Sequence, residues 1–210
     1  MANFLTKIRA QLRAINHVRK ERRDYKRWLR KGRPNPPPHR VKQEIIQKFQ
    51  RRSNYTTFVE TGTFRGDMVE AQKRQFDTIY SIELSQYYYE RAVERFKGIP
   101  HIHLLFGDSS VVLPSIIAKL DSPAIFWLDG HYSAGQTAKG DKECPILEEI
   151  DAIFSGKPLD HIILIDDARC FNGEGDYPTI ESLTASIQEK DNRYHIAVEN
   201  DVIRCIVVHL

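Results

Sequence analysis

The spacing of apolar residues divides the chain into a helical leader, a proline-rich linker and a longer region of alternating strands and helices. Between residues 4 and 29, apolar side chains recur mostly at three- and four-residue steps, the period of one helix face, while arginines and lysines fill the other face. The run Pro-Asn-Pro-Pro-Pro at 34–38 cannot be helical and predicts a stiff, extended segment. We therefore expect a basic amphipathic helical extension over 1–33, a linker over 34–39 and one folded domain over 40–210.

Within the folded domain, short apolar runs typical of buried strands alternate with stretches typical of helices, which favours a parallel sheet with crossover helices. Strands are expected near 57–61, 78–84, 102–106, 124–129 and 162–166, and helices near 67–75, 86–97, 110–120, 145–154 and 178–189. At the end of the chain, two β-rich runs are separated by only Asn200-Asp201, which predicts a hairpin. The predicted fold class is α/β, with a doubly wound, Rossmann-like, seven-stranded sheet that ends in an antiparallel C-terminal hairpin.

The charge distribution points to an anionic partner for the leader. The formal net charge of +3 hides an asymmetry, because residues 1–52 carry 17 Lys and Arg against 3 Asp and Glu, while the rest of the chain carries 14 against 25. A basic leader joined to an acidic body favours either an anionic surface or self-association with the body of a neighbouring copy.

Composition also limits the class of protein. No apolar run approaches the ~20 residues of a transmembrane helix, and the basic N-terminus lacks the features of a signal peptide. Cys144, Cys170 and Cys205 lie far apart with no CxxC pair, so neither a zinc site nor a disulfide framework is indicated. We expect a cytoplasmic protein, at most peripheral to a membrane.

Candidate chemistry begins where the first strand runs into a glycine-containing turn, in the sequence from Glu60 to Asp67. In doubly wound sheets this turn lies under the ligand, because the carboxyl ends of the strands open the binding crevice. Gly62 would let the backbone approach a ligand, and Glu60 would offer a carboxylate to a cationic amine. The alternative is a tight strand-to-helix turn that binds nothing.

The second and third strand ends extend this pattern. Glu83 lies 21 positions beyond Gly62, where a carboxylate can accept hydrogen bonds from both hydroxyls of a ribose. Taken with the first turn, it favours an adenosine-containing ligand over a solvated acid. Asp108 and Ser109 follow the third strand and either face the adenine edge or cap the next helix.

Three carboxylates, those of Asp129, Asp166 and Asp167, follow the fourth and fifth strands. Such a cluster repels itself unless a cation lies in it, and an all-oxygen site suits Mg²⁺ or a similar hard ion. The alternative is that Asp167 caps a turn and only Asp129 lines the pocket.

The order of these motifs resembles the class I S-adenosylmethionine-dependent methyltransferases over about residues 40–210, and within them the Mg²⁺-dependent O-methyltransferases of the catechol and sugar (macrocin) types. The resemblance implies S-adenosylmethionine and a divalent cation as cofactors, with Asp129, Asp166 and Asp167 as metal ligands. The cofactor-binding residues it implies are Glu60, Gly62, Thr63, Phe64, Gly66, Glu83, Leu84, Asp108, Ser109 and Asp129.

The chain also departs from both branches of that family. The catechol enzymes carry a lysine base three residues after the first metal aspartate, where this chain has Tyr132, and the sugar branch has an acid where this chain has His131. Because histidine is a competent base near neutral pH, His131 or Asp129 is expected to accept the substrate proton. A histidine that only hydrogen-bonds to neighbouring carboxylates is the alternative.

These patterns predict metal-assisted O-methylation of a small hydroxyl-bearing substrate such as a sugar, a polyphenol or a lipid head group. A second hypothesis is a non-catalytic adaptor that keeps a nucleoside pocket while its basic leader binds a membrane surface or nucleic acid. A nicotinamide-dependent oxidoreductase is disfavoured, because the first turn lacks GxGxxG and the fourth and fifth strands end in acids.

Overall fold

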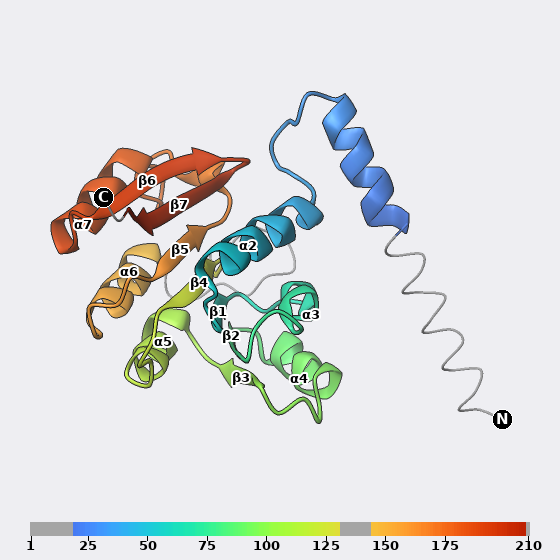
Figure 1. Cartoon of the computed structure of the whole chain (residues 1–210), viewed down its shortest axis with the longest axis horizontal. Helices are drawn as coiled ribbons and strands as arrows, with labels where there is room; N and C mark the ends of the chain where they lie inside the picture. Colours follow the sequence, from blue (N-terminus) through green and yellow to red (C-terminus); the bar gives the residue numbers. More distant parts are fainter. Residues whose placement is uncertain (1–18, 131–143, 209–210) are drawn as a thin grey trace.

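The computed structural model describes residues 19–130 and 144–208 and contains one seven-stranded sheet (Figure 1). The strand order is β3-β2-β1-β4-β5-β7-β6, and β7 is antiparallel to both of its neighbours. The strands are β1 (Thr57–Thr61), β2 (Thr78–Glu83), β3 (Ile102–Phe106), β4 (Ala124–Leu128), β5 (Ile162–Ile165), β6 (Tyr194–Glu199) and β7 (Val202–Val207). This arrangement confirms the predicted α/β fold class.

Helices cover both faces of the sheet (Figure 1). Helices α2 (His39–Ser53), α3 (Asp67–Gln72) and α4 (Gln86–Arg95) pack on one face. On the other face lie α5 (Ser109–Ile117), α6 (Ile146–Phe154) and α7 (Ile180–Lys190), and the short 3-10 helix η1 (Ala168–Cys170) follows β5. The strands between two helical layers are apolar on both sides, which is why they read as continuous hydrophobic runs in the sequence.

The core consists of two clusters, one on each face of the sheet. Along β4, Ile125 and Trp127 point into the cluster under α2, while Phe126 and Leu128 point into the cluster under α5 and α6. Successive side chains of a strand alternate between faces, so a shift of β4 by one residue would move each of these side chains to the wrong cluster. Their burial therefore fixes the register of β4. The carboxyl ends of the parallel strands are thereby held at one edge of the sheet.

The C-terminal hairpin forms as the sequence predicts. Asn200 and Asp201 both adopt positive φ values, 53° and 61°, as a two-residue turn of this type requires. The carboxylate of Asp201 also accepts a hydrogen bond from the backbone N–H of Arg169, at 2.9 Å. The hairpin therefore supports the segment that follows β5.

The leader contributes a helix over 19–30, which the proline-rich segment connects to α2. Trp28 is only 7% exposed and belongs to the same apolar cluster as α2, and its indole N–H donates to the carbonyl of Pro34 at 2.8 Å. Within residues 19–130 and 144–208, no helix is long and apolar enough to cross a membrane.

A buried histidine next to β5 makes stability depend on pH. The backbone N–H of Ala124 donates to Nδ1 of His161 at 3.1 Å, and burial lowers the pKa of His161 to about 4. Below its ordinary pKa of 6.5, the unfolded chain binds a proton that the folded chain does not, so stability falls as the pH falls towards 4.

We expect this residue to reduce the free energy of unfolding by about 1 kcal/mol per pH unit between its two pKa values. Urea unfolding at several pH values should show that His161→Asn, whose side-chain carbonyl can still accept from Ala124, flattens the slope. His195→Asn, at an exposed position of β6, is the matched control and should leave the slope as it is. An identical slope in the wild type and His161→Asn would contradict the assignment.

Candidate functional site

The carboxyl ends of β1, β2, β4 and β5 bring the predicted site residues to one edge of the sheet. The parallel registers place Glu60 beside Ser81 on one side and Trp127 on the other. The backbone N–H of Asp129 donates to the carbonyl of Thr61 at 3.1 Å, and that of Asp166 donates to the carbonyl of Leu128 at 3.0 Å. Residues from four separate stretches of the sequence therefore meet at this edge.

The turn after β1 depends on Gly62. Its φ is +86°, and a Cβ at this position would lie 2.4 Å from the carbonyl oxygen of Asp129. Its backbone N–H donates to the carbonyl of Ile82 at 2.9 Å. Only glycine allows this close approach of the β1 turn to the end of β4, because any side chain would collide with backbone atoms.

Glu60 is the most deeply buried acid of the turn. The side chain is 2% exposed and accepts a hydrogen bond from the hydroxyl of Ser81, whose Oγ lies 2.6 Å from Oγ1 of Thr63. Burial raises the pKa of Glu60 well above its usual range, and the Ser81 hydrogen bond opposes this only in part. A cationic group placed beside Glu60 would stabilise its ionised form.

Glu83 links the loop after β1 to the loop after β2 through hydrogen bonds. Its Oε2 accepts from the backbone N–H of Phe64 at 2.6 Å, and its Oε1 accepts from that of Ser85 at 2.7 Å. Burial raises the pKa of Glu83, while hydrogen bonds from the backbone N–H groups of Ser85, Phe64 and Leu84 oppose the shift. Of the roughly four lone-pair sites of a carboxylate, these three donors leave about one for a ligand hydroxyl.

The other residues of the first motif complete the turn. Phe64 packs against Tyr88 with ring centroids 4.5 Å apart. Gly66 begins α3 with a φ of +73°, and a Cβ there would lie 2.6 Å from the ring of Phe96. Thr63 is buried beneath the loop.

At the third strand end, the helix-cap alternative is the one that the structure contains. Oδ1 of Asp108 accepts from both the backbone N–H and the hydroxyl of Ser110, at 2.9 and 2.6 Å, and so caps α5. Ser109 is the first residue of that helix and is 7% exposed. An adenine contact by either residue stays a prediction.

The carboxylates after β5 have a partner that the sequence analysis did not identify. Nζ of Lys42, on α2, contacts Oδ2 of Asp166 and lies 3.1 Å from Oδ1 of Asp167. The guanidinium of Arg169 lies 2.8 Å from the same oxygen of Asp167 and also contacts Asp201. Burial and the neighbouring Asp129 raise the pKa of Asp166, and the ion pair with Lys42 opposes this shift.

Two further buried residues at this edge were missed. Ser81 lies in the middle of an apolar strand, and its position opposite Glu60 becomes meaningful only in the β1–β2 register. Glu149 of α6 is 2% exposed, and its Oε1 would lie 3.1 Å from a Cβ placed on Gly130. A charged residue on the apolar face of α6 is the sequence signal that could have identified Glu149.

His131, the predicted base, lies outside the described residues, as does most of the loop after β4. Asp129, the alternative base, is half-buried at the end of β4. Among residues 19–130 and 144–208, no three or more His, Cys, Asp or Glu side chains are grouped so that they could hold a metal ion. Metal binding by Asp129, Asp166 and Asp167 therefore stays a prediction.

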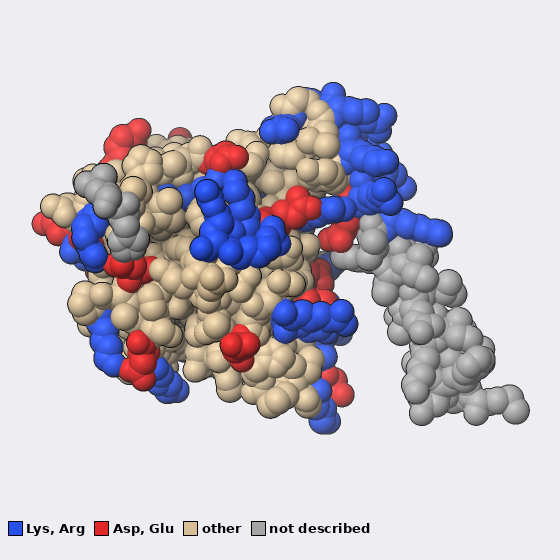
Figure 2. All heavy atoms as spheres, viewed as in Figure 1, with Lys and Arg blue, Asp and Glu red and all other residues tan. Residues whose placement is uncertain are grey.

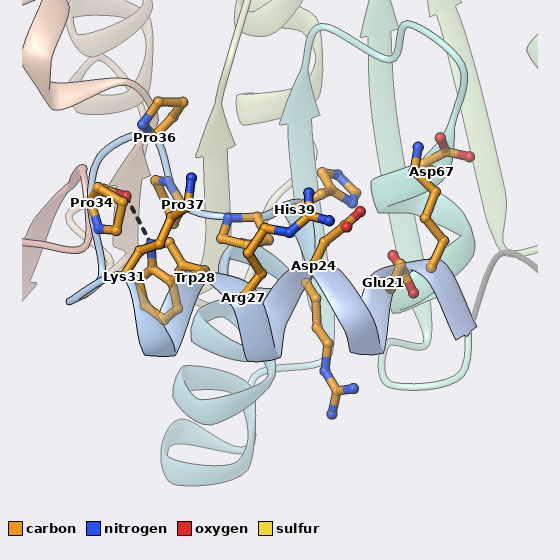
Figure 3. A pocket seen from close by; sticks show the side chains of 13 residues that line it. Glu21, Asp24, Arg27, Trp28, Lys31, Pro34, Pro36, Pro37, His39 and Asp67 are labelled. Carbon is orange, nitrogen blue, oxygen red and sulfur yellow. Dashed lines mark hydrogen bonds between the residues drawn. The ribbon is translucent and has the colours of Figure 1, made fainter.

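The leader helix and α2 enclose a separate cleft of about 400 Å³ (Figure 3). Its walls combine Trp28 and the prolines of the linker with charged side chains of both signs, including Asp24, Arg27 and Asp67. The guanidinium of Arg40 lies 5.2 Å from the ring centre of Tyr25, which joins α2 to the leader helix. The apolar side of the leader helix is therefore turned towards the domain.

The opposite side of the leader helix is rich in cations. Its exposed face gathers Arg19, Arg22, Arg23, Lys26 and Arg30 around a shallow hollow of about 440 Å³. Figure 2 shows the resulting dense cover of Lys and Arg over this helix.

Comparison with known proteins identifies the fold. No family model and no curated relative matches the chain. Among solved structures, an O-methyltransferase from Bacillus cereus in complex with SAH aligns with a TM-score of 0.60 and 12% identity over 83% of this chain and 84% of its own. The O-methyltransferase TomG from Streptomyces achromogenes, in complex with SAM, aligns at 0.56 with 12% identity over 89% and 88%. The SAH-bound Podospora anserina methyltransferase PaMTH1 aligns at 0.55 with 16% identity over 81% and 79%.

These alignments cover most of each chain at low identity. They show that the chain has the fold of the class I S-adenosylmethionine-dependent methyltransferases, as its motifs led us to expect.

Proposed function

We propose that this protein is an S-adenosylmethionine-dependent methyltransferase that methylates a hydroxyl group of a small substrate. The observation that carries the proposal is the arrangement of Glu60, Gly62 and Glu83 along the carboxyl edge of a methyltransferase-fold sheet. Solved structures with this fold include proteins bound to SAM and SAH.

The residues at this edge suit the chemical groups of the cofactor. Glu60 is a buried carboxylate with a raised pKa, and the ammonium group of the cofactor would supply the positive charge that stabilises its ionised form. Glu83 is held by backbone N–H groups and keeps acceptor capacity for a ribose hydroxyl. Gly62 lets the turn after β1 lie directly against the backbone at the end of β4, so both segments reach the same edge of the sheet.

When bound, the cofactor supplies the methyl group on its sulfonium. The protein would contribute position and a proton acceptor, and no covalent intermediate is needed. Asp129, at the end of β4, and His131, two residues further on, are the proposed acceptors of the hydroxyl proton. The methyl acceptor is a sugar, a polyphenol or a lipid head group, and no step of this scheme passes through a metal ion.

Isothermal titration of the full chain with S-adenosylhomocysteine, with NAD for comparison, tests the proposal. We expect S-adenosylhomocysteine to bind and NAD not to bind. Formation of S-adenosylhomocysteine from S-adenosylmethionine, followed across catechols and sugars, then identifies the acceptor class. A folded protein that binds neither S-adenosylmethionine nor S-adenosylhomocysteine would refute the proposal and favour the adaptor hypothesis.

We further propose that the leader helix binds a phosphate-rich polymer. Arginine, which supplies four of the five cations on the exposed face, matches phosphate geometry well. Tyr25 and Trp28 pack towards the domain, and Leu29 is the one large apolar side chain exposed within residues 19–30, so the exposed face offers much charge and little apolar surface for insertion into a bilayer. This favours nucleic acid over a membrane as the anionic partner.

Fluorescence anisotropy with a labelled single-stranded RNA should show binding that weakens with salt. Replacing Arg19, Arg22 and Arg23 with alanine should lower the affinity for RNA. It should also reduce the steepness with which log affinity falls against log salt concentration, by roughly 0.7 for each phosphate that is no longer neutralised. The matched control removes Lys48, Arg51 and Arg52, which are exposed on α2. Equal losses in both triple variants would indicate attraction by net charge alone, and binding only to anionic vesicles would favour a membrane partner.

A further inference from the structure

A lysine from α2 reaches the carboxylates at the end of β5, 124 residues further along the chain. Nζ of Lys42 contacts Oδ2 of Asp166 and lies 3.1 Å from Oδ1 of Asp167. All three side chains are mostly shielded from water, with 13% of Lys42, 1% of Asp166 and 9% of Asp167 exposed. At this depth, an ion pair is screened much less than one on the surface.

This contact places a positive charge beside the cluster of carboxylates formed by Asp129, Asp166 and Asp167. Carboxylates at neighbouring strand ends need a positive charge to stay ionised together, which is the reason a divalent ion is expected from the sequence. Lys42 supplies one positive charge to Asp166 and Asp167, and Arg169 supplies a second to Asp167. The chain's own side chains therefore provide the charge that a metal ion would otherwise bring.

The hydrogen bonds of the two aspartates also leave little room for a hard cation. Oδ1 of Asp166 accepts from the backbone N–H of Asp167 at 2.8 Å, Oδ2 of Asp166 accepts from Lys42, and Oδ1 of Asp167 accepts from both Lys42 and Arg169. Because Mg²⁺ demands near-octahedral oxygen ligands, it would have to displace the ammonium group of Lys42 to reach both residues. The side chains as arranged do not fit the expected metal ion.

We propose that Lys42 is the resident cation of this carboxylate cluster and takes the place of the divalent ion that the sequence predicts there. Lys42 is a positioning residue, because it acts through Asp166 and Asp167. Any effect of Lys42 on turnover depends on the proposed methyltransferase activity. The effect of Lys42 on metal binding does not depend on that activity.

Titration of the full chain with Mn²⁺, followed by electron paramagnetic resonance of the free ion, tests this proposal without any substrate. The wild type should show no site in the millimolar range. Lys42→Ala should bind Mn²⁺ at least about ten-fold more tightly than the wild type does, because the two carboxylates have lost their ammonium partner. Adding Asp166→Asn to Lys42→Ala should remove this tighter binding again.

Two variants serve as controls. Lys42→Arg keeps a cation beside the aspartates and should bind Mn²⁺ as poorly as the wild type. Lys48→Ala removes an exposed lysine from the same helix and should change nothing. S-adenosylhomocysteine titration of each variant reports the proposed function separately, because the Mn²⁺ result is defined whether or not the cofactor binds.

Tight Mn²⁺ binding by the wild type, lost in Asp166→Asn, would overturn the proposal, because it would show that the ion displaces Lys42. The wild type and Asp166→Asn together decide this point, even if Lys42→Ala does not fold. A folded Lys42→Ala that binds Mn²⁺ no better than the wild type would equally overturn it.

Discussion

Replacing Gly62 with alanine is expected to weaken S-adenosylhomocysteine binding by about 100-fold, or ~3 kcal/mol. The new Cβ would lie 2.4 Å from the carbonyl oxygen of Asp129 and 2.9 Å from its carbonyl carbon, so the end of β4 or the turn after β1 must move. The φ of +86° adds the ordinary cost of a left-handed conformation for a residue with a side chain. Since the turn and the end of β4 both belong to the proposed binding site, this movement is expected to disturb that site.

Gly98→Ala is the matched control for this experiment. Gly98 has a similar φ of +79°, but a Cβ there would meet nothing within 4 Å. The Gly98→Ala substitution should lower the melting temperature through backbone strain alone and leave the affinity for S-adenosylhomocysteine unchanged. Titration calorimetry and thermal unfolding of both variants separate the two effects. A folded Gly62→Ala protein with wild-type affinity would show that the turn is not part of the binding site.

The fold was predictable because its signals are local. Each buried strand is a short apolar run between two helical periods, and the Asn200-Asp201 turn between two β-rich runs fixes the hairpin at the end. The edge formed by Glu60, Gly62 and Glu83 followed from the same pattern, because the carboxyl ends of neighbouring parallel strands must meet.

The partners of the site residues were not predictable in the same way. The buried Ile45, Ile46 and Phe49 lie three, four and seven residues after Lys42, so the apolar pattern of α2 places the lysine on the buried face but does not say which residues it contacts. Its direction depends on how α2 docks on the sheet, and its partners lie 124 and 125 residues away. The cap that Asp108 forms likewise depends on the position of Ser110, which only the structure shows.

Glu83→Ala should weaken S-adenosylhomocysteine binding by roughly 2 to 3 kcal/mol, because hydrogen bonds to a charged acceptor are the stronger kind. The substitution removes two roles of the carboxylate together. In the structure it holds the backbone N–H of Phe64 at 2.6 Å, and we propose that it also accepts a hydrogen bond from the ribose. A loss of affinity alone would therefore not show that Glu83 contacts the ribose.

A double-mutant cycle with the ligand separates these roles. The 2′-deoxy analogue of S-adenosylhomocysteine lacks a hydroxyl that Glu83 is proposed to bind, so it should bind the wild type more weakly than the natural ligand. In Glu83→Ala the two ligands should bind with equal affinity, giving a coupling energy of about 1 to 2 kcal/mol. If the carboxylate only positions the loop at Phe64, Glu83→Ala will weaken both ligands by the same factor and the coupling energy will be zero. Titration calorimetry of the two proteins with the two ligands thus decides whether Glu83 binds the ribose or acts only through the turn that it holds.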